Sequence, residues 1–247
     1  LGENVLELNG MSGHGFSNVN LTVKKGSIVG LTGLQGSGSS ELLQGLFGAV
    51  PVTGGTLKVS GKECRIHGIQ GAMKAGIAML ASNRKENSVI PDMSILENMY
   101  LSEQVLSARQ PLISARRERE RYEKYKKLLS IKAADSKDPI TSLSGGNQQK
   151  VFLARWLNTE AGILLLDNPT QGIDVGAKAE IYKLILKLAD AGKTILINTL
   201  EIPELAKVAD CCAVFYEGTI IKMLQHEEID EKTVMLYSTN AAQKGES

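Results

Sequence analysis

The feature that most limits the fold is an apolar run over residues 27–32 that leads directly into a glycine-rich octet. A continuous apolar run of this length is typical of a strand buried on both faces, and the glycines after it favour a tight turn. A helical pattern follows over about residues 39–46. This order of elements predicts a parallel sheet of the α/β class. The octet is Gly33-Leu34-Gln35-Gly36-Ser37-Gly38-Ser39-Ser40.

The other strand signals fall into two groups. Short alternating segments separated by glycines predict an antiparallel β part near the start, at residues 5–8, 19–23 and 56–59. Further buried strands that alternate with helical patterns are predicted at residues 76–80, 162–166, 194–198 and 213–216. The core is therefore expected to be α/β, with an antiparallel β part.

Strand signals disappear between residues 82 and 156, where the pattern predicts a helical insertion. Ser94 is expected to cap a helix with Glu97 in the capping-box position. The charged stretch over residues 115–129 has an apolar face, which predicts a solvated helix that packs one stripe; a partner-specific arm is the alternative. That face consists of Tyr122, Tyr125, Leu128 and Leu129. We expect one domain over residues 1–247, with 1–81 and 157–247 as the α/β core and 82–156 as the helical subdomain.

Composition narrows the functional class. Of the 247 residues, 43% are apolar and 22% are charged, and the net charge is +1. This balance is ordinary for a globular domain and predicts no nucleic-acid partner. The longest apolar runs are far shorter than the roughly 20 residues that cross a bilayer. The three cysteines have no metal-type spacing, which favours a reducing compartment.

The octet has the spacing of a phosphate-binding loop, G-x-x-x-x-G-K-[ST], with Ser39 in the lysine position. Backbone N–H groups of such a loop hold phosphates, and Ser40 supplies the hydroxyl that binds magnesium. Losing one charged hydrogen bond weakens nucleotide binding by about tenfold to a hundredfold. Taken alone, the octet is also compatible with a simple strand-to-helix turn.

Two later motifs favour the phosphate-loop interpretation. Four apolar residues end in Asp167, a carboxylate that would hold magnesium through water. Upstream, an LSGG motif with two glycines behind a serine predicts a helix start that exposes N–H groups to an anion. That motif and its extension are Leu143, Ser144, Gly145, Gly146, Asn147, Gln148, Gln149 and Lys150.

In this order the motifs resemble those of ATP-binding-cassette (ABC) proteins, in the form found in importers of ribose, galactose and arabinose. The resemblance implies the P-loop NTPase core of an ABC ATPase, with an N-terminal antiparallel β subdomain and a helical insertion. It implies ATP and Mg²⁺ as cofactors, residues 33–41 including Glu41 as nucleotide-binding, Ser40 and Asp167 as metal ligands, and Asp174 in the D-loop. Phe16 and His14 are weak candidates for stacking on adenine, and a core or loop role suits them better.

The family's catalytic residues are replaced at several positions. Asn168 occupies the position of the catalytic glutamate, and an amide cannot act as a base. Ser82 occupies the Q-loop position and is too short to reach magnesium. Glu201 occupies the position of the switch histidine, where a carboxylate would repel the γ-phosphate.

The resemblance also makes residues 143–148 the signature motif of the family. An intact signature beside a degenerate nucleotide site resembles the C-terminal half of a tandem sugar-importer ATPase. That resemblance implies partners: a second nucleotide-binding domain, expected in the N-terminal half of the same polypeptide, membrane permease subunits, and indirectly a periplasmic or extracellular sugar-binding protein. Leu1 in place of methionine fits a cut between two halves. The expected location is the cytoplasmic face of the membrane. Residues 83–91 and the helix from Ser94 are the expected permease-docking surface, with an ordinary surface loop as the alternative. A non-catalytic scaffold that binds no nucleotide is the alternative function.

Overall fold

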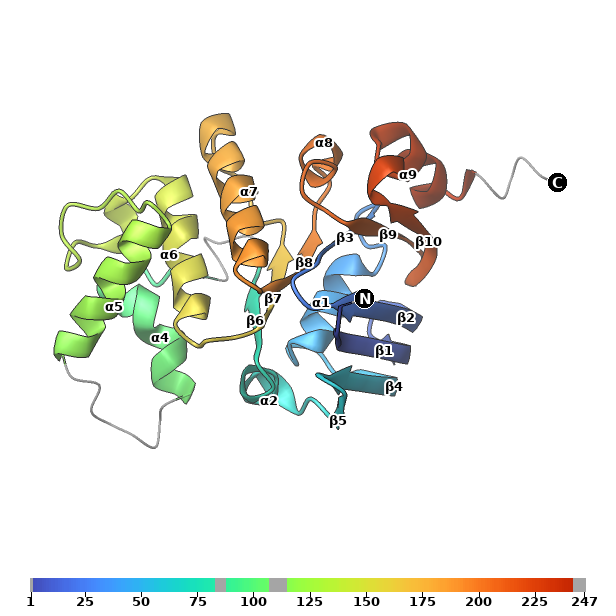
Figure 1. The fold of residues 1–247 in the computed structure, drawn as a ribbon, viewed down its shortest axis with the longest axis horizontal. Helices are drawn as coiled ribbons and strands as arrows, with labels where there is room; N and C mark the ends of the chain where they lie inside the picture. The colour runs from blue at the N-terminus through green and yellow to red at the C-terminus, as the bar shows by residue number, and fades with distance from the viewer. Residues whose placement is uncertain (1, 83–87, 107–114, 242–247) are drawn as a thin grey trace.

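The computed structural model describes residues 2–82, 88–106 and 115–241 and contains two β-sheets (Figure 1). The smaller sheet is antiparallel with the order β2-β1-β4-β5, formed by β1 (Asn4–Gly13), β2 (Phe16–Lys24), β4 (Val52–Val59) and β5 (Lys62–Cys64). The larger sheet has the order β10-β9-β3-β8-β7-β6. It consists of β3 (Ile28–Gly33), β6 (Ile77–Leu80), β7 (Ile163–Asp167), β8 (Thr194–Asn198), β9 (Cys211–Tyr216) and β10 (Thr219–Gln225). All its strands are parallel except β10, which pairs antiparallel with β9.

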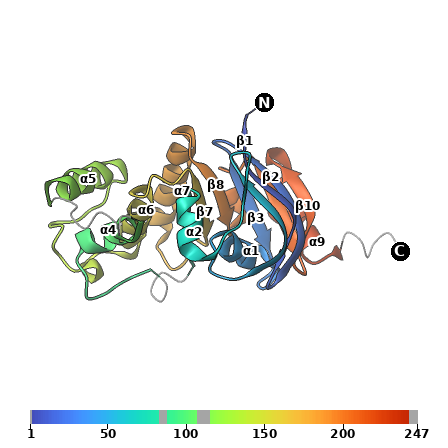
Figure 2. The ribbon, with the colours of Figure 1, turned by 90° about the horizontal axis from the view of Figure 1, so that it is seen from below.

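Helices cover both faces of the larger sheet. In Figures 1 and 2, α4, α5 and α6 lie together at one end, and α7 lies between them and the strands of the larger sheet. The helices are α1 (Ser39–Leu46), α2 (Gly68–Lys74), α4 (Ile95–Leu106), α5 (Ala115–Leu128), α6 (Gly145–Leu157), α7 (Val175–Asp190), α8 (Ile202–Leu205) and α9 (Glu231–Ser238). Among the described residues, no helix is both long enough and apolar enough to cross a membrane.

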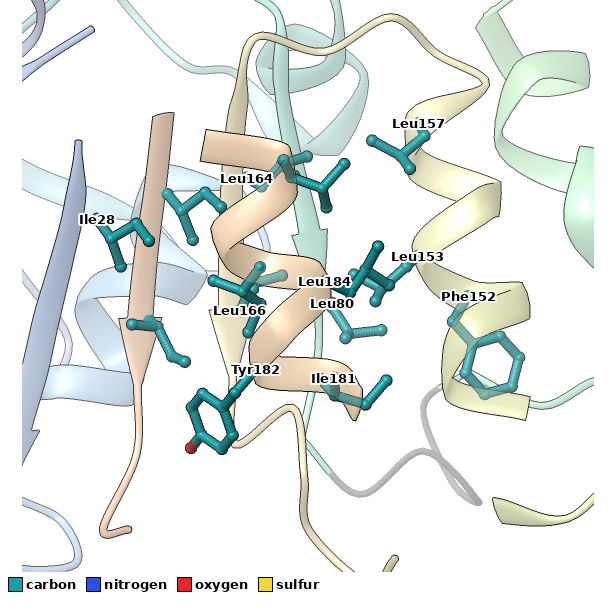
Figure 3. Close-up of a cluster of buried hydrophobic side chains, with 14 of the residues drawn as sticks. Ile28, Leu80, Phe152, Leu153, Leu157, Leu164, Leu166, Ile181, Tyr182 and Leu184 are labelled. Carbon is teal, nitrogen blue, oxygen red and sulfur yellow. The ribbon is translucent and has the colours of Figure 1, made fainter. Parts of the chain in front are cut away.

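Alternating side chains of the larger sheet enter two separate cores. Leu164 and Leu166 of β7 pack with Tyr182 of α7 and Phe152 of α6 in one core, shown in Figure 3. Leu165, between them, packs on the opposite face with α1 and the antiparallel sheet. Because successive side chains of a strand point to opposite faces, a strand covered on both sides needs the continuous apolar run seen in β7. Because both faces of β7 are buried, the position of its carboxyl end is fixed by packing, and the loop that follows it contributes residues to the site described below.

The predicted α/β core and the antiparallel β part are confirmed. The expected capping box is also present: the Ser94 backbone N–H donates to Glu97 Oε2 at 2.8 Å, and the Glu97 N–H donates to Ser94 Oγ at 3.2 Å. The expected apolar face of α5 is only partly correct. Tyr122, Tyr125 and Leu129 are buried, whereas Leu128 is 47% exposed. Leu128 is one residue from Leu129, about 100° around a helix, and so points away from the buried stripe.

Candidate functional site

A cavity of about 520 Å³ lies at the carboxyl ends of β3, β6, β7 and β8. Loops emerge at this edge of a parallel sheet, and ligands of such folds bind there. The size lies within the usual range for ligand pockets. The wall consists of Gly33, Leu34, Gln35, Gly36, Ser39, Ser40, Glu41, Ser82, Asn168, Thr170, Gln171, Asn198, Thr199, Leu200 and Glu201.

The glycine-rich loop between β3 and α1 has a conformation that requires its glycines. Gly36 and Gly38 have backbone φ angles of 76° and 102°, a region that residues other than glycine rarely adopt. A Cβ on Gly38 would also approach the carbonyl oxygen of Gly15 to 2.5 Å. The loop ends at α1, whose first N–H groups have no intrahelical partners and attract anions. The loop therefore has the shape of a phosphate-binding loop.

Side chains of the octet have different environments. Ser39, in the lysine position, is 6% exposed and forms part of the pocket wall, so the wall carries a neutral hydroxyl at that point. Ser37 is not among the wall residues; its hydroxyl is buried and has no hydrogen-bond partner within the described part of the chain. Glu41 lies on the wall in the first turn of α1. Apart from Ser37 and Gly38, every residue expected in the nucleotide-binding loop lines the cavity.

Ser40 and Asp167 meet at the expected metal position. Ser40 Oγ donates a hydrogen bond to Asp167 Oδ2 at 2.7 Å, and Asn198 Nδ2 donates to Asp167 Oδ1 at 2.7 Å. Asp167 is 1% exposed and is held by neutral donors in these contacts. Ser40 lines the cavity, and Asp167 lies directly behind it without being part of the wall. A hydroxyl and a carboxylate are the hard oxygen ligands that Mg²⁺ prefers, so the residues present fit this ion.

Asn168 and Ser82 lie on the pocket wall, as expected from their positions in the sequence. Asn168 has a φ of 46°, a left-handed conformation that asparagine tolerates better than most residues. Its side-chain amide donates to Asp167 Oδ1 at 3.3 Å, and its backbone N–H donates to the Asn198 carbonyl at 2.8 Å. The amide is thus used to hold the neighbouring carboxylate.

Glu201 has partners that the sequence did not indicate. Its Oε2 accepts a hydrogen bond from Thr170 Oγ1 at 2.8 Å, and its Oε1 pairs with the Lys178 ammonium. The carboxylate expected to repel a phosphate is therefore compensated by a cation from the first turn of α7. No motif in the sequence links Lys178 to Glu201, because their contact depends on how α7 packs beside the loop after β8.

The signature residues form the start of α6. Ser144 caps the helix: its Oγ accepts from the Asn147 backbone N–H at 3.5 Å and from Asn147 Nδ2 at 3.0 Å. Asn147 Oδ1 accepts the Lys132 N–H at 2.8 Å, and Gln148 Nε2 donates to the Leu143 carbonyl at 3.1 Å. These side chains fix the helix start, and its exposed end fits the predicted anion-binding surface.

None of the signature residues, 143–148, belongs to the wall of the cavity that the structure shows. In Figure 1, α7 lies between α6 and α1. A Cβ on Gly146 would lie 2.6 Å from Ala177 Cβ, so the signature helix packs directly on the first turn of α7. Asp174 caps that turn, accepting the Ala177 N–H at 2.9 Å. The signature and the D-loop residue are thus adjacent to each other.

Other candidate residues have simpler outcomes. Phe16 is 2% exposed and lies in the core, and His14 is exposed, as their core or loop roles require.

Of the expected docking segment, residues 83–87 lie outside the described residues. Asn98, fully buried on α4, holds the loop that precedes this helix: its Oδ1 accepts the Ile90 N–H at 3.1 Å.

Comparisons with known proteins agree with this geometry. Residues 16–171 match the ABC transporter family. The chain is 40% identical over 224 residues to the ribose import ATP-binding protein RbsA of Halalkalibacterium halodurans, covering 91% of this chain and 45% of that protein. It is 39% identical over 237 residues to the arabinose import ATP-binding protein AraG of Vibrio parahaemolyticus, covering 95% of this chain and 47% of that protein. A solved nucleotide-free ATP-binding cassette from an ABC transporter superposes with a TM-score of 0.82 at 21% identity, over 95% of this chain and 98% of that one.

The fold and the pocket define a P-loop cassette of the ABC type, as the resemblance implied. The chain belongs to the ABC transporter family. The curated relatives described above are import ATP-binding proteins for ribose and arabinose, and the chain spans about half of their length.

Proposed function

We propose that this chain is an ATP-binding domain of a carbohydrate importer that completes the ATP site of a second cassette. The observation that carries the proposal is the contrast between two sites. The start of α6 retains every signature residue at an exposed helix end, whereas the chain's own pocket has Ser39, Asn168 and Glu201 where the family has a lysine, a base and a histidine. The 39% and 40% identities to sugar-import proteins support a carbohydrate as the transported substrate class.

The chain's own pocket is proposed to bind ATP weakly. The loop of residues 34–38 and the first turn of α1 would hold the phosphates, while Ser40 and Asp167 would hold Mg²⁺. Bound magnesium would offset phosphate charge. Because Asn168 cannot take a proton from water, hydrolysis in this pocket is expected to be slow or absent. Activity of ABC-ATPase type would then depend on a partner's pocket.

Several partners follow from this function. The second nucleotide-binding domain is proposed to be the N-terminal half of the same polypeptide, because the chain covers only 45% and 47% of its relatives. We further propose contacts with permease subunits, through α4 and the loop before it, and an indirect link to an external sugar-binding protein. The domain would lie at the cytoplasmic face of the membrane. In this scheme residues 1–81 and 157–247 form the core, and residues 82–156 form the helical subdomain that carries the signature.

The test compares ATP turnover of the chain alone and with the second cassette. The chain alone is expected to hydrolyse little ATP, and turnover is expected to appear when the second cassette is added. Ser144→Arg would block the exposed helix end and remove that gain, whereas Thr141→Arg, at a nearby exposed position, is the matched control. Turnover by the isolated chain at the rate of a complete importer, or an unchanged gain in Ser144→Arg, would contradict the proposal.

A second candidate is a scaffold cassette that binds no nucleotide. It is favoured by the chemistry of the wall, which carries Glu41 and Glu201 and has Ser39 in the lysine position. Magnesium-ATP titrated into the isolated chain separates the two candidates. Weak but saturable heat of binding supports the nucleotide-binding function, and no heat at millimolar nucleotide supports the scaffold.

A further inference from the structure

Two adjacent residues in the first turn of α7 contact two different functional regions. Ala177 lies against Gly146 of the signature helix, at a distance that leaves no room for a Cβ on the glycine. Lys178, the next residue, pairs with Glu201 on the wall of the nucleotide pocket. The pocket and the signature helix are therefore connected through a single helical turn.

The Glu201 carboxylate is held at both oxygens. Thr170, 1% exposed in the turn after β7, donates to one oxygen, and Lys178 pairs with the other. Both charged side chains are about one-third exposed, at 29% and 30%. The ion pair is thus neither fully solvated nor locked in the core, and its strength depends on the charge that occupies the pocket.

A polyphosphate in the pocket would act on the two charges in opposite directions. It would repel Glu201, which lines the wall, and attract Lys178. A ligand can shift a structural equilibrium only if its interaction energy differs between the two states, and this ion pair meets that condition. The rigid contact between Ala177 and Gly146 would then pass a displacement of the turn to the start of α6.

We propose that Lys178 is a positioning residue that couples the nucleotide pocket to the signature helix of the same chain. With the pocket empty, its ion pair with Glu201 holds the first turn of α7, and with it the start of α6. Filling the pocket weakens the pair and changes how firmly the signature is held. The second half of this proposal rests on the proposed binding of nucleotide.

The first test needs no nucleotide. Hydrogen exchange of the whole chain is measured for Lys178→Met, for Glu201→Gln and for the control Lys183→Met, which changes an exposed lysine of the same helix. Losing a partly exposed ion pair is expected to speed exchange of amides 145–149 by about two- to fivefold in the first two variants. The control is expected to match the unmodified chain. The charge-reversed pair, Lys178→Glu with Glu201→Lys, is expected to restore slow exchange. Unchanged exchange at 145–149 in both single variants would overturn the proposal.

The second test adds magnesium-ATP to the unmodified chain and to Lys178→Met. Protection of amides 34–40 reports nucleotide binding, and exchange at 145–149 reports the response of the signature. We expect protection of 34–40 in both proteins and a change at 145–149 in the unmodified chain alone. An equal response at 145–149 in both proteins would refute coupling through Lys178. No protection of 34–40 in either protein would instead refute the proposed nucleotide binding and leave the link itself to the first test.

Discussion

Gly146 of the signature helix and Ala177 of α7 are packed so closely that a Cβ on the glycine would lie 2.6 Å from the alanine Cβ. Gly146→Ala is therefore expected to destabilise the fold by about 1–3 kcal/mol, the usual cost of overpacking. Ala177→Gly alone is expected to cost about 1 kcal/mol through helix propensity. In the double variant the clash disappears. Its loss of unfolding free energy, measured by urea unfolding, should therefore be smaller than the sum of the losses in the two single variants.

A glycine elsewhere provides the control for this cycle. A Cβ on Gly162 would meet nothing within 4 Å. Gly162→Ala should therefore leave the urea midpoint nearly unchanged. Strictly additive losses for Gly146 and Ala177 would show that the contact is not the reason for the glycine.

Restoring the missing cation should strengthen nucleotide binding. In Ser39→Lys the ammonium would reach phosphate oxygens from the helix start, and we expect affinity for magnesium-ATP to rise by about tenfold to a hundredfold. Ser39→Met, which adds length without charge, is the control for packing at this 6% exposed position. Isothermal titration measures both, and an equal gain in the methionine variant would rule out the charge as the cause.

Removing the Ser40 hydroxyl should make nucleotide binding much less dependent on magnesium. The hydroxyl lies 2.7 Å from Asp167 Oδ2, so Ser40→Ala removes one proposed ligand and one donor to a buried carboxylate. We expect a stability loss of about 1–3 kcal/mol and a smaller ratio of nucleotide affinities with and without magnesium. Ser17→Ala, at an exposed site on β2, is the control. A ratio that stays the same in Ser40→Ala would exclude Ser40 as a ligand.

Asn98 should be a major contributor to stability of the helical region. Arg155 is buried, and its guanidinium donates to the Asn98 carbonyl at 2.6 Å and to Asn98 Oδ1 at 3.0 Å. Burial lowers the pKa of Arg155 to about 10, because desolvation disfavours its charged form. Asn98→Ala removes one acceptor from this charge and is expected to cost about 2–3 kcal/mol. Thermal unfolding measures the loss; a change below 0.5 kcal/mol, about the scatter for surface substitutions, would contradict the assigned role.

Buried tyrosines should make the fold sensitive to alkaline pH. Burial raises the pKa of Tyr100, Tyr122 and Tyr125 in the folded chain above the ordinary value of about 10. Below pH 10 both states keep the phenol protons. Above it the unfolded state loses them first, so stability falls as pH rises toward the folded pKa values. Urea unfolding between pH 9 and 11 should show a shallower decline for Tyr100→Phe than for the control Tyr237→Phe.

Sequence patterns predicted those elements whose signal is local and strong. Strands such as β7 and β8 are buried on both faces and appear as continuous apolar runs. The edge strand β10 was not anticipated, because residues 219–225 are mostly half-buried and mix polar with apolar side chains. Leu128 was also placed on the wrong face by the sequence pattern. Side chains of successive helical residues point about 100° apart, so an error of one residue exchanges a buried position for an exposed one.

The candidate site was predictable in its residue types and less so in its contacts. Motif spacing placed Ser40 and Asp167 together, although they are 127 residues apart, because the order of strand, loop and helix is specific. No comparable pattern linked Lys178 to Glu201. Their contact depends on how α7 packs beside the loop after β8, which is a property of the assembled core.

The glycine-rich loop is held by two segments that lie far from each other in the sequence. The Gly218 N–H, between β9 and β10, donates to the Ser37 carbonyl, and the Ser17 N–H, at the start of β2, donates to the Gly218 carbonyl, both at 2.9 Å. These supports come from outside the motif and none involves residue 39. The backbone shape of the loop is therefore set partly by segments distant in the sequence, so a phosphate-binding conformation at this position does not by itself measure how well the loop binds or hydrolyses nucleotide.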